Sequence, residues 1–593
     1  MSVHPRTYTG SRGPAVPATG APSVDVSDGP SLLARPDLPT ATDALPIATV
    51  ASSAVQSGTV PADSVPSGPQ LPGTPSPIRR ALQRRRSGAR APYGTVAAAV
   101  VISLATLVPL GFVIVMTVAT GWETAAELIF RPRVGELLFN TVALVLATVP
   151  LCIVIGIAAA WLVERTQLPG ARFWSLVLAA PLAVPAFVNS YAWVSTIPSL
   201  GGVGGGTLIS VLSYYPLVYI PAAAALRRMD PALEQSAASL GLGRWRTFFR
   251  VILPQLWLPI TGGALLVGLH LLAEFGAFSM IRFPTFTTAI MEQYQSTFNG
   301  AAANMLASVL VFICLLMLLA ESRLRGNARY ARIGSGVASR PPALPLGRYR
   351  VAAVVGVLAL AVLALGVPLG NILRWLVAGG AEIWNLPVIG ETLLQTLGFG
   401  LAGALLTVVL AFPVAWLAVR YPGWFTKMLE STNYITSSLP GIVVALAFIT
   451  VAINFARPLY QTVPLVIAAY VLLFLPRALV NLRAGLAQAP QELEEAARSL
   501  GSSPSKTFFR VTLRLTAPAA AGGAALVFLG IANELTATLL LAPTGVNTLA
   551  TRFWALSSEI DYTGAAPYAL ILILLSLPMT YLLYTQSQKA AGQ

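Results

Sequence analysis

The chain has 593 residues, of which 55% are hydrophobic and only 10% are charged. Soluble globular proteins carry roughly 25% charged residues, so this composition excludes a water-exposed globular protein and predicts one that uses lipid as its main solvent. The net charge of +15 comes mostly from arginines in loops and in the amino-terminal segment. No RNA-binding aromatic motif or zinc-ligand spacing accompanies these arginines, which argues against a nucleic-acid-binding protein.

Residues 1–93 are rich in Pro, Ser, Gly, Ala and Thr and contain few large apolar residues. Such a segment buries too little apolar surface to offset its ordering entropy, so we predict a disordered tail. It ends in a cluster of arginines at Arg79, Arg80, Arg84, Arg85, Arg86 and Arg90. The cluster is typical of an orientation signal that keeps the amino terminus in the cytoplasm. The first long apolar stretch begins too far into the chain for a cleaved signal peptide.

Twelve apolar stretches follow, each of about 20 residues or more and therefore long enough to cross a bilayer. They lie at 95–118, 136–163, 173–196, 206–226, 254–275, 303–321, 350–377, 392–419, 431–453, 462–482, 515–541 and 566–585. Pro216 and Pro221 interrupt the fourth stretch. We predict an all-α membrane protein with about twelve transmembrane helices.

The distribution of positive charge supports twelve spans. With the amino terminus inside and the tail left out, the predicted cytoplasmic loops contain 22 Lys or Arg residues. The predicted external loops contain five, which are Arg131, Arg133, Arg282, Arg457 and Arg552, and the remaining two, Arg374 and Arg477, fall at predicted span ends. A shifted topology would invert this bias for half of the molecule, so the positive-inside rule favours twelve spans with a cytoplasmic amino terminus.

The second half of the chain repeats the first. Ala160–Arg165 returns as Ala415–Arg420 at an offset of 255, and Thr247–Val251 returns as Thr507–Val511 at an offset of 260. Six spans per half is an even number, so both halves enter the membrane in the same orientation and are related by an axis along its normal. The predicted segments are a disordered cytoplasmic tail (1–93), a first transmembrane domain (94–321), a cytoplasmic linker (322–349) and a second transmembrane domain (350–593).

A long cytoplasmic loop recurs in both halves. In the second half Pro490 precedes Glu494, Glu495 and two alanines, which predicts a short helix with acidic residues near its positive end. Gly501 is a good residue to end that helix, and an apolar-faced second helix follows it.

This segment resembles the EAA loop of binding-protein-dependent ABC importer permeases (type I), whose pattern is E-A-A, three residues, G, nine residues, I, one residue, L-P. In the second half the matching residues are Glu495, Ala496, Ala497, Gly501, Val511 and Leu513, with Arg514 where proline is usual. In the first half they are Gln235, Ser236, Ala237, Gly241, Val251, Leu253 and Pro254. Gln235 and Ser236 replace the glutamate and the first alanine of the motif there, and Glu234, one residue earlier, is a candidate substitute.

The resemblance implies that both loops are coupling helices, which dock on two ABC ATPase subunits and transmit their closure to the membrane spans. The implied coupling residues are Glu234, Gln235, Ala237, Gly241, Glu494, Glu495, Ala496, Ala497 and Gly501. A phosphate-binding P-loop needs a lysine after glycine, and none of the three lysines of this chain follows one. We therefore expect a permease that is not an enzyme and binds no cofactor, with ATP used by the partner ATPase.

Two acidic residues, Glu274 and Glu534, lie at equivalent positions near the predicted outer ends of spans five and eleven. Charge inside a bilayer is costly and usually faces a cavity or a partner. Two interpretations stay open: a polar pair that lines an outer gate, or two carboxylates that accept hydrogen bonds from local amides. His270 shares a helical face with Glu274, and we expect it to form a helix–helix hydrogen bond or to contact the solute.

Several other residue types suggest metal chemistry but are better explained by packing. Cys152 and Cys314 lie in separate apolar stretches, which is typical of buried small hydrophobes. Tyr214, Tyr215 and Tyr219 carry hard oxygen donors, but their apolar surroundings favour packing or an aromatic belt. We predict no metal site.

The sequences around the two glutamates narrow the expected cargo. The segments 274–277, 282–290 and 534–541 resemble the corresponding parts of ferric-iron permeases, with Thr536 where that group has proline. The resemblance implies a fused two-domain iron permease, a multi-pass protein of the bacterial plasma (inner) membrane that takes its solute from an extracytoplasmic binding protein. Import of thiamine, phosphonate or polyamine remains an alternative, as does a twelve-span secondary transporter.

Overall fold

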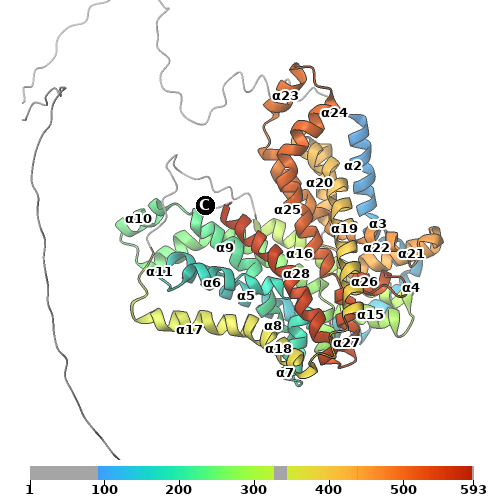
Figure 1. Cartoon of the computed structure of the whole chain (residues 1–593), viewed down its shortest axis with the longest axis horizontal. Coiled ribbons are helices and arrows are strands. Elements are labelled where there is room, and N and C mark those ends of the chain that lie inside the picture. The colour runs from blue at the N-terminus through green and yellow to red at the C-terminus, as the bar shows by residue number, and fades with distance from the viewer. Residues whose placement is uncertain (1–90, 326–342, 437, 590–593) are drawn as a thin grey trace, which may run out of the picture. The chain divides into compact units, whose positions relative to one another are not determined.

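The computed structural model describes residues 91–325, 343–436 and 438–589, which form an all-helical assembly (Figure 1). Within these residues the only β-type pairing is an isolated parallel bridge between Thr166 and Leu344. The predicted disordered tail falls almost entirely outside the described residues, as do its arginine cluster and the middle of the predicted linker.

The first half contributes fifteen α-helices to the described residues. These are α2 (Tyr93–Thr106), α3 (Val108–Thr120), α4 (Trp122–Ile129), α5 (Pro132–Arg165), α6 (Ala171–Val177), α7 (Ala186–Thr196), α8 (Gly202–Tyr214), α9 (Pro216–Arg228), α10 (Pro231–Ser239), α11 (Arg244–Thr247), α12 (Leu253–Gln255), α13 (Trp257–Ala273), α14 (Gly276–Met280), α15 (Phe286–Gln295) and α16 (Gly300–Arg325). A 3₁₀ turn, η1 (Ala180–Ala183), and a π turn, η2 (Phe248–Ile252), lie between them.

The second half has a similar succession of elements, with twelve α-helices in the described residues. Its helices are α17 (Arg350–Ala361), α18 (Val367–Gly379), α19 (Leu386–Arg420), α20 (Trp424–Thr436), α21 (Gly441–Phe455), α22 (Val463–Gln488), α23 (Gln491–Ser499), α24 (Pro504–Thr507), α25 (Leu513–Ala532), α26 (Thr536–Leu541), α27 (Leu549–Ser558) and α28 (Tyr562–Lys589). The short turns are η3 (Gly347–Tyr349), η4 (Val362–Gly366), η5 (Arg457–Leu459) and η6 (Phe508–Thr512).

These elements agree with the predicted total of about twelve spans. In the described part of the chain, eight helices are long and apolar enough to cross a membrane, and the total reaches twelve if each of four bent helix pairs is one span. The fourth predicted span corresponds to α8 and α9, which together run from Gly202 to Arg228 and are not one of the four bent pairs; Pro216 occupies the first turn of α9, where its missing N–H costs little.

Two of the predicted spans, 173–196 and 431–453, are bent through about a right angle. The bend between α6–η1 and α7 is 91°, and the bend between α20 and α21 is 102°. Pro185 and Pro440 stand directly before the second helix of each pair, in extended conformations that no α-helix continues through. These two prolines are equivalent in the repeat, so the bend belongs to both halves.

Each half has a core of three packed helices. In the first half α5 packs against α9 and α13, and in the second half α19 packs against α22 and α25. The first helices of each half cross over to the other half, since α2 packs on α19 and α20 while α18 packs on α7. Hydrogen bonds mark both crossings: Asn433 of α20 donates to Ser103 of α2 (3.0 Å), and Asn371 of α18 donates to Thr196 of α7 (2.7 Å).

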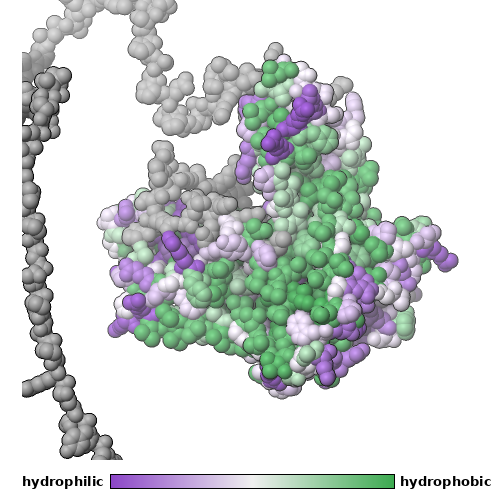
Figure 2. All heavy atoms as spheres, viewed as in Figure 1, coloured by the Kyte–Doolittle hydropathy of each residue, from purple (hydrophilic) through white to green (hydrophobic). Residues whose placement is uncertain are grey.

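Apolar side chains cover much of the outer surface. Figure 2 shows hydrophobic residues gathered over α25 and α28, with hydrophilic residues around α10–α11 and α23–α24. Large side chains such as Val118, Phe139 and Leu405 are mostly exposed. Soluble monomers rarely expose contiguous apolar surface on this scale, so these faces are suited to lipid.

The residues for which packing was predicted are indeed packed. Cys152 and Cys314 are both fully buried and free of any disulfide. Tyr214, Tyr215 and Tyr219 are buried in the core of the first half, and the Tyr219 hydroxyl donates to the Ser175 carbonyl oxygen (3.1 Å).

Candidate functional site

The two predicted loop helices exist and end in the same way. After α23, the N–H of Gly501 donates to the Arg498 carbonyl and the N–H of Ser502 donates to the Ala497 carbonyl, both at 3.0 Å. After α10, Gly241 and the residue that follows it make the same two bonds. Both glycines are left-handed, with φ of +78° at Gly241 and +82° at Gly501. A side chain is strained in that conformation, so the glycine spacing of the motif reflects a helix-terminating turn.

The outward faces of α10 and α23 combine apolar and polar groups. Leu240 is 81% exposed and Leu500 is 87% exposed, and they occupy equivalent positions. Gln235, Glu495 and Ala496 are also exposed, whereas Ala497 is partly buried and Ala237 is buried. Figure 1 shows the two helices well apart, each at the periphery of its own half. Such exposed leucines on short helices suit a protein partner.

An ion pair holds each helix on its inner face, and both of its members are buried in the second half. The Arg420 guanidinium lies 2.7 Å from the Glu494 carboxylate, and the Arg165 guanidinium lies 2.6 Å from Glu234. The two arginines are the last residues of α19 and α5. Glu234 and Glu494 are therefore equivalent, and the position after them, Gln235 or Glu495, faces outward.

Each loop returns to the membrane spans through a π turn. Phe248–Ile252 and Phe508–Thr512 are π-helical, which makes the repeated Thr-Phe-Phe-Arg-Val segment a repeated geometry as well. In both turns the two phenylalanine rings meet edge to face with centroids 5.1 Å apart. Isolated π turns are rare and frequently occur at functional sites.

Glu274 and Glu534 stand at breaks in helices. Glu274 separates α13 from α14, and its carboxylate accepts from the Ala277 N–H (2.9 Å) and from the Tyr214 hydroxyl (2.7 Å). Glu534 lies between α25 and α26 and accepts from the Ala537 N–H (2.9 Å). Both carboxylates thus cap a short helix through local amides, as the second of the two sequence interpretations expects.

The two breaks also meet each other, which keeps the gate interpretation open. A Cβ on Gly276 would lie 2.8 Å from a methyl of Leu535 and 2.8 Å from Cβ of Phe187. Gly276 follows Glu274 closely and Leu535 follows Glu534, so the first half and the second half touch between the two glutamates. Glu274 and Glu534 are only partly buried, although their helices are packed.

His270 bonds within its own helix and not across to another. Its Nδ1 lies 2.7 Å from the Leu266 carbonyl oxygen, and its ring centroid lies 5.4 Å from that of Tyr214. Among the described residues no hydrogen bond joins His270 to another helix, so its helix–helix hydrogen bond stays a prediction. Solute contact by His270 remains a prediction.

Arg477 is a charged residue whose role the sequence did not predict. It was assigned to a span end, but α22 extends to Gln488, which places Arg477 near the middle of the helix. The residue is exposed, and its guanidinium lies 4.9 Å from the Phe474 ring centroid.

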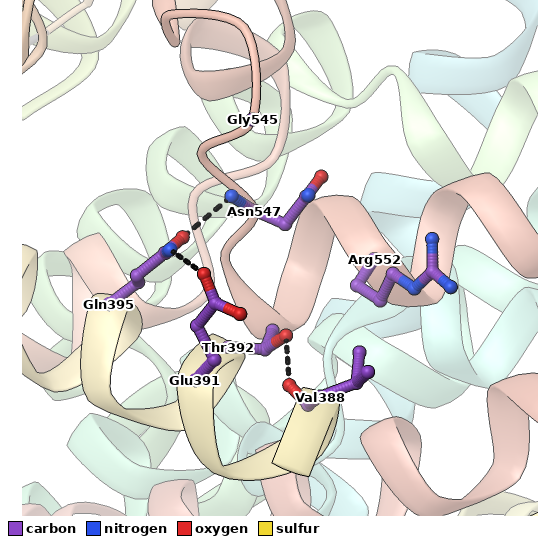
Figure 3. A pocket seen from close by; sticks show the side chains of 7 residues that line it. All are labelled: Val388, Glu391, Thr392, Gln395, Gly545, Asn547 and Arg552. Atoms are coloured by element: carbon purple, nitrogen blue, oxygen red, sulfur yellow. Dashed lines mark hydrogen bonds between the residues drawn. The ribbon is translucent and has the colours of Figure 1, made fainter. Parts of the chain in front are cut away.

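A polar pocket of about 170 Å³ lies at the start of α19 (Figure 3). Gln395 is its organising residue, donating to Glu391 (3.1 Å) and accepting from the Asn547 N–H (2.7 Å). The lining residues are Val388, Glu391, Thr392, Gln395, Gly545, Asn547 and Arg552. The pocket combines a carboxylate, a guanidinium and amide groups, which suits a polar partner.

The duplicated helical membrane architecture, with an exposed short helix in each half and helix breaks where the halves meet, is typical of a transport permease. The chain belongs to the family of binding-protein-dependent transport system inner membrane components, whose model matches residues 118–325 and 408–591. It is therefore a multi-pass protein of the inner membrane. The two matched stretches fall in the two predicted halves, which supports the fused, two-domain interpretation.

Individual relatives cover different shares of the chain. The Fe(3+)-transport system permease protein FbpB 2 of Haemophilus influenzae is 36% identical over 490 residues, which are 82% of this chain and 97% of the relative. The ferric transport system permease protein FbpB of Actinobacillus pleuropneumoniae is 24% identical over 68% of this chain and 61% of its own length. The sulfate transport system permease protein CysW of Synechocystis is 27% identical over 31% of this chain and 75% of its own length.

Proposed function

We propose that this chain is the fused permease subunit of an ATP-driven importer of ferric iron. The observation that carries the cargo is the 36% identity with an Fe(3+)-transport permease over 97% of that relative's length. The observation that carries the ATP dependence is the pair of glycine-terminated helices α10 and α23, one in each half.

Two ABC ATPase subunits would dock on α10 and α23, on the cytoplasmic side where the amino terminus also lies. The exposed Leu240 and Leu500 supply apolar contact area, and Glu495 supplies a charged contact in the second half. The neighbouring Ala496 and Ala497 have small side chains, which keep this face of α23 narrow enough to enter a cleft of the ATPase. ATP binding and hydrolysis belong to those partners.

Solute would arrive on an extracytoplasmic binding protein and pass between the two halves. The pocket that contains Glu391 lies on the proposed outer side and offers the docking protein a polar contact. The contact between the halves at Gly276 and Leu535 would act as the closed gate, and Glu274, Glu534, His270 and Arg477 are the polar residues proposed to line the path. Because both glutamates cap short helices, separating the halves moves the carboxylates together with those helices.

Uptake of radioactive ferric iron by a deletion strain that carries the gene on a plasmid tests the cargo, with thiamine, a phosphonate and a polyamine measured in parallel. Iron uptake that depends on the plasmid supports the proposal, and uptake of another solute alone overturns it. Arg477 favours phosphonate among the alternatives, because an exposed guanidinium attracts an anion.

Co-purification tests the coupling assignment. The wild-type chain should co-purify with an ABC ATPase, and Glu495→Lys or Gly501→Asp should weaken that association and abolish uptake. Normal complex formation and uptake in both variants would refute the assignment. A secondary transporter would instead keep its activity without the ATPase and lose it when the proton gradient is collapsed.

A further inference from the structure

One guanidinium in the second half joins three separate elements. Arg420, the last residue of α19, pairs with Glu494 of α23 through Nη2 and Oε1 at 2.7 Å. The same side chain donates to the carbonyl oxygens of Leu486 and Ala489 at the end of α22, both at 3.3 Å. The arginine side chain is 6% exposed and the glutamate side chain is 10% exposed. The pair is therefore a structural joint inside the protein, and neither charge is available to a docking partner.

The first half builds the same joint from partly different residues. Arg165, the last residue of α5, lies 2.6 Å from Glu234 of α10; the arginine side chain is 3% exposed, and the glutamate side chain is 25% exposed. The adjacent Glu164 accepts from Arg227 at the end of α9 (2.5 Å), so α5 is again connected to both the preceding span and the short helix. The described end of the predicted linker adds a further bond, since the N–H of Leu344 donates to the Arg165 carbonyl (2.8 Å).

Repetition separates this joint from an incidental ion pair. The arginines are 255 residues apart and the glutamates 260 apart, the two offsets of the sequence repeat. The next residue has diverged between the halves, to Gln235 in one and Glu495 in the other, while the buried pair has not. Neighbouring residues on a helix point about 100° apart, so one position can face the core while the next faces a partner.

Burial makes these pairs sensitive to the loss of one partner. A desolvated charge is tolerable only while it is compensated, so removing either member leaves the other uncompensated. The Arg133–Glu136 pair offers a contrast, because its 2.8 Å contact is about half exposed on both sides. Exposed ion pairs of that kind contribute little to the stability of a protein.

We propose that Arg165 and Arg420 are the positioning residues of the two coupling helices. Each arginine fixes the orientation of a short helix relative to the end of a long span, so that movement of the docked ATPase rotates α5 or α19 instead of bending the loop. The inference rests on the proposed coupling function. It adds that the charge at Glu234 and Glu494 serves this internal joint, whereas the ATPase meets the residues beside it.

The test uses the complete permease–ATPase complex in proteoliposomes, with the loaded binding protein supplied outside. Arg420→Gln should retain ATPase co-purification and ATP hydrolysis, while the ATP consumed per solute transported rises about tenfold or more because a buried carboxylate loses its counter-charge. Arg165→Gln should also retain co-purification and ATP hydrolysis and raise the ATP consumed per solute, in this case through α10 in the first half. Arg133→Gln is the matched control and should leave the ratio of ATP to solute unchanged.

A double-mutant cycle guards against a variant that simply misfolds. Arg420→Gln combined with Glu494→Gln leaves a neutral hydrogen-bonding pair, so its coupling ratio should recover most of the way to wild type. Two results would overturn the proposed role of these arginines. One is a wild-type ratio of ATP to solute in both Arg420→Gln and Arg165→Gln. The other is a double variant whose defect equals the summed defects of Arg420→Gln and Glu494→Gln. Absence of an ATPase from the wild-type complex would instead refute the proposed function, so the two failures are distinguishable.

Discussion

Replacing Gly501 by alanine isolates the left-handed turn that ends α23. The glycine has φ of +82°, and a Cβ at this position would meet nothing within 4 Å, so steric clash plays no part. The left-handed conformation costs an alanine about 1–2 kcal/mol. Alanine also lowers the conformational entropy of the unfolded chain, which offsets about 0.4–1 kcal/mol of that conformational cost. The net loss of roughly 1 kcal/mol corresponds to about a fivefold smaller population of the correctly ended helix.

The assay is equilibrium binding of the purified ATPase to the detergent-solubilised permease. Gly501→Ala should weaken binding about fivefold, whereas Gly501→Asn should bind nearly as well as wild type, because asparagine tolerates a positive φ. Gly135→Ala is the matched control, since Gly135 also has open space around it but lies within α5 at an ordinary φ. Equal binding by the alanine and asparagine variants would refute the conformational reasoning.

Three further predictions concern the space between the halves. Tyr214→Phe removes the hydroxyl that donates to Glu274 and should lower the stability of the purified permease by about 1–3 kcal/mol in denaturant unfolding; an unchanged midpoint would contradict it. Gly276→Ala forces a Cβ to within 2.8 Å of Leu535 and should reduce uptake, with partial recovery when Leu535→Ala is added; no recovery would argue against that contact as the gate. Arg477→Gln should reduce uptake while ATPase co-purification stays normal, and normal uptake would remove Arg477 from the path.

Features that repeat or extend along the chain could be predicted from the sequence. The spans follow from stretches of apolar residues, and the halves follow from segments such as Ala160–Arg165 and Ala415–Arg420, which recur at fixed offsets. The helix ends at Gly241 and Gly501 follow from the special conformation that glycine allows. Each of these signals is local, so no knowledge of the packing partner is needed.

Features that depend on a distant partner could not be predicted in the same way. Nothing in the loop sequence says that Glu494 faces inward and Glu495 outward, because the partner Arg420 lies 74 residues earlier. Arg477 was misplaced since α22 continues beyond the apolar stretch that marked its predicted end. The right-angle bends did have a signal in Pro185 and Pro440, but an average over about 20 apolar residues conceals a single proline.

The crossing of α2 onto the second half has a consequence for biogenesis. Ser103 of α2 bonds Asn433 of α20, which lies 330 residues later in the chain. At a synthesis rate of 5–20 residues per second, roughly 15–65 s pass between the two. During that time the first helix sits in the bilayer without its final neighbour, so the amino-terminal half completes its packing only when the carboxy-terminal half is translated. A single polypeptide guarantees that this neighbour always arrives, in equal number and in the same patch of membrane.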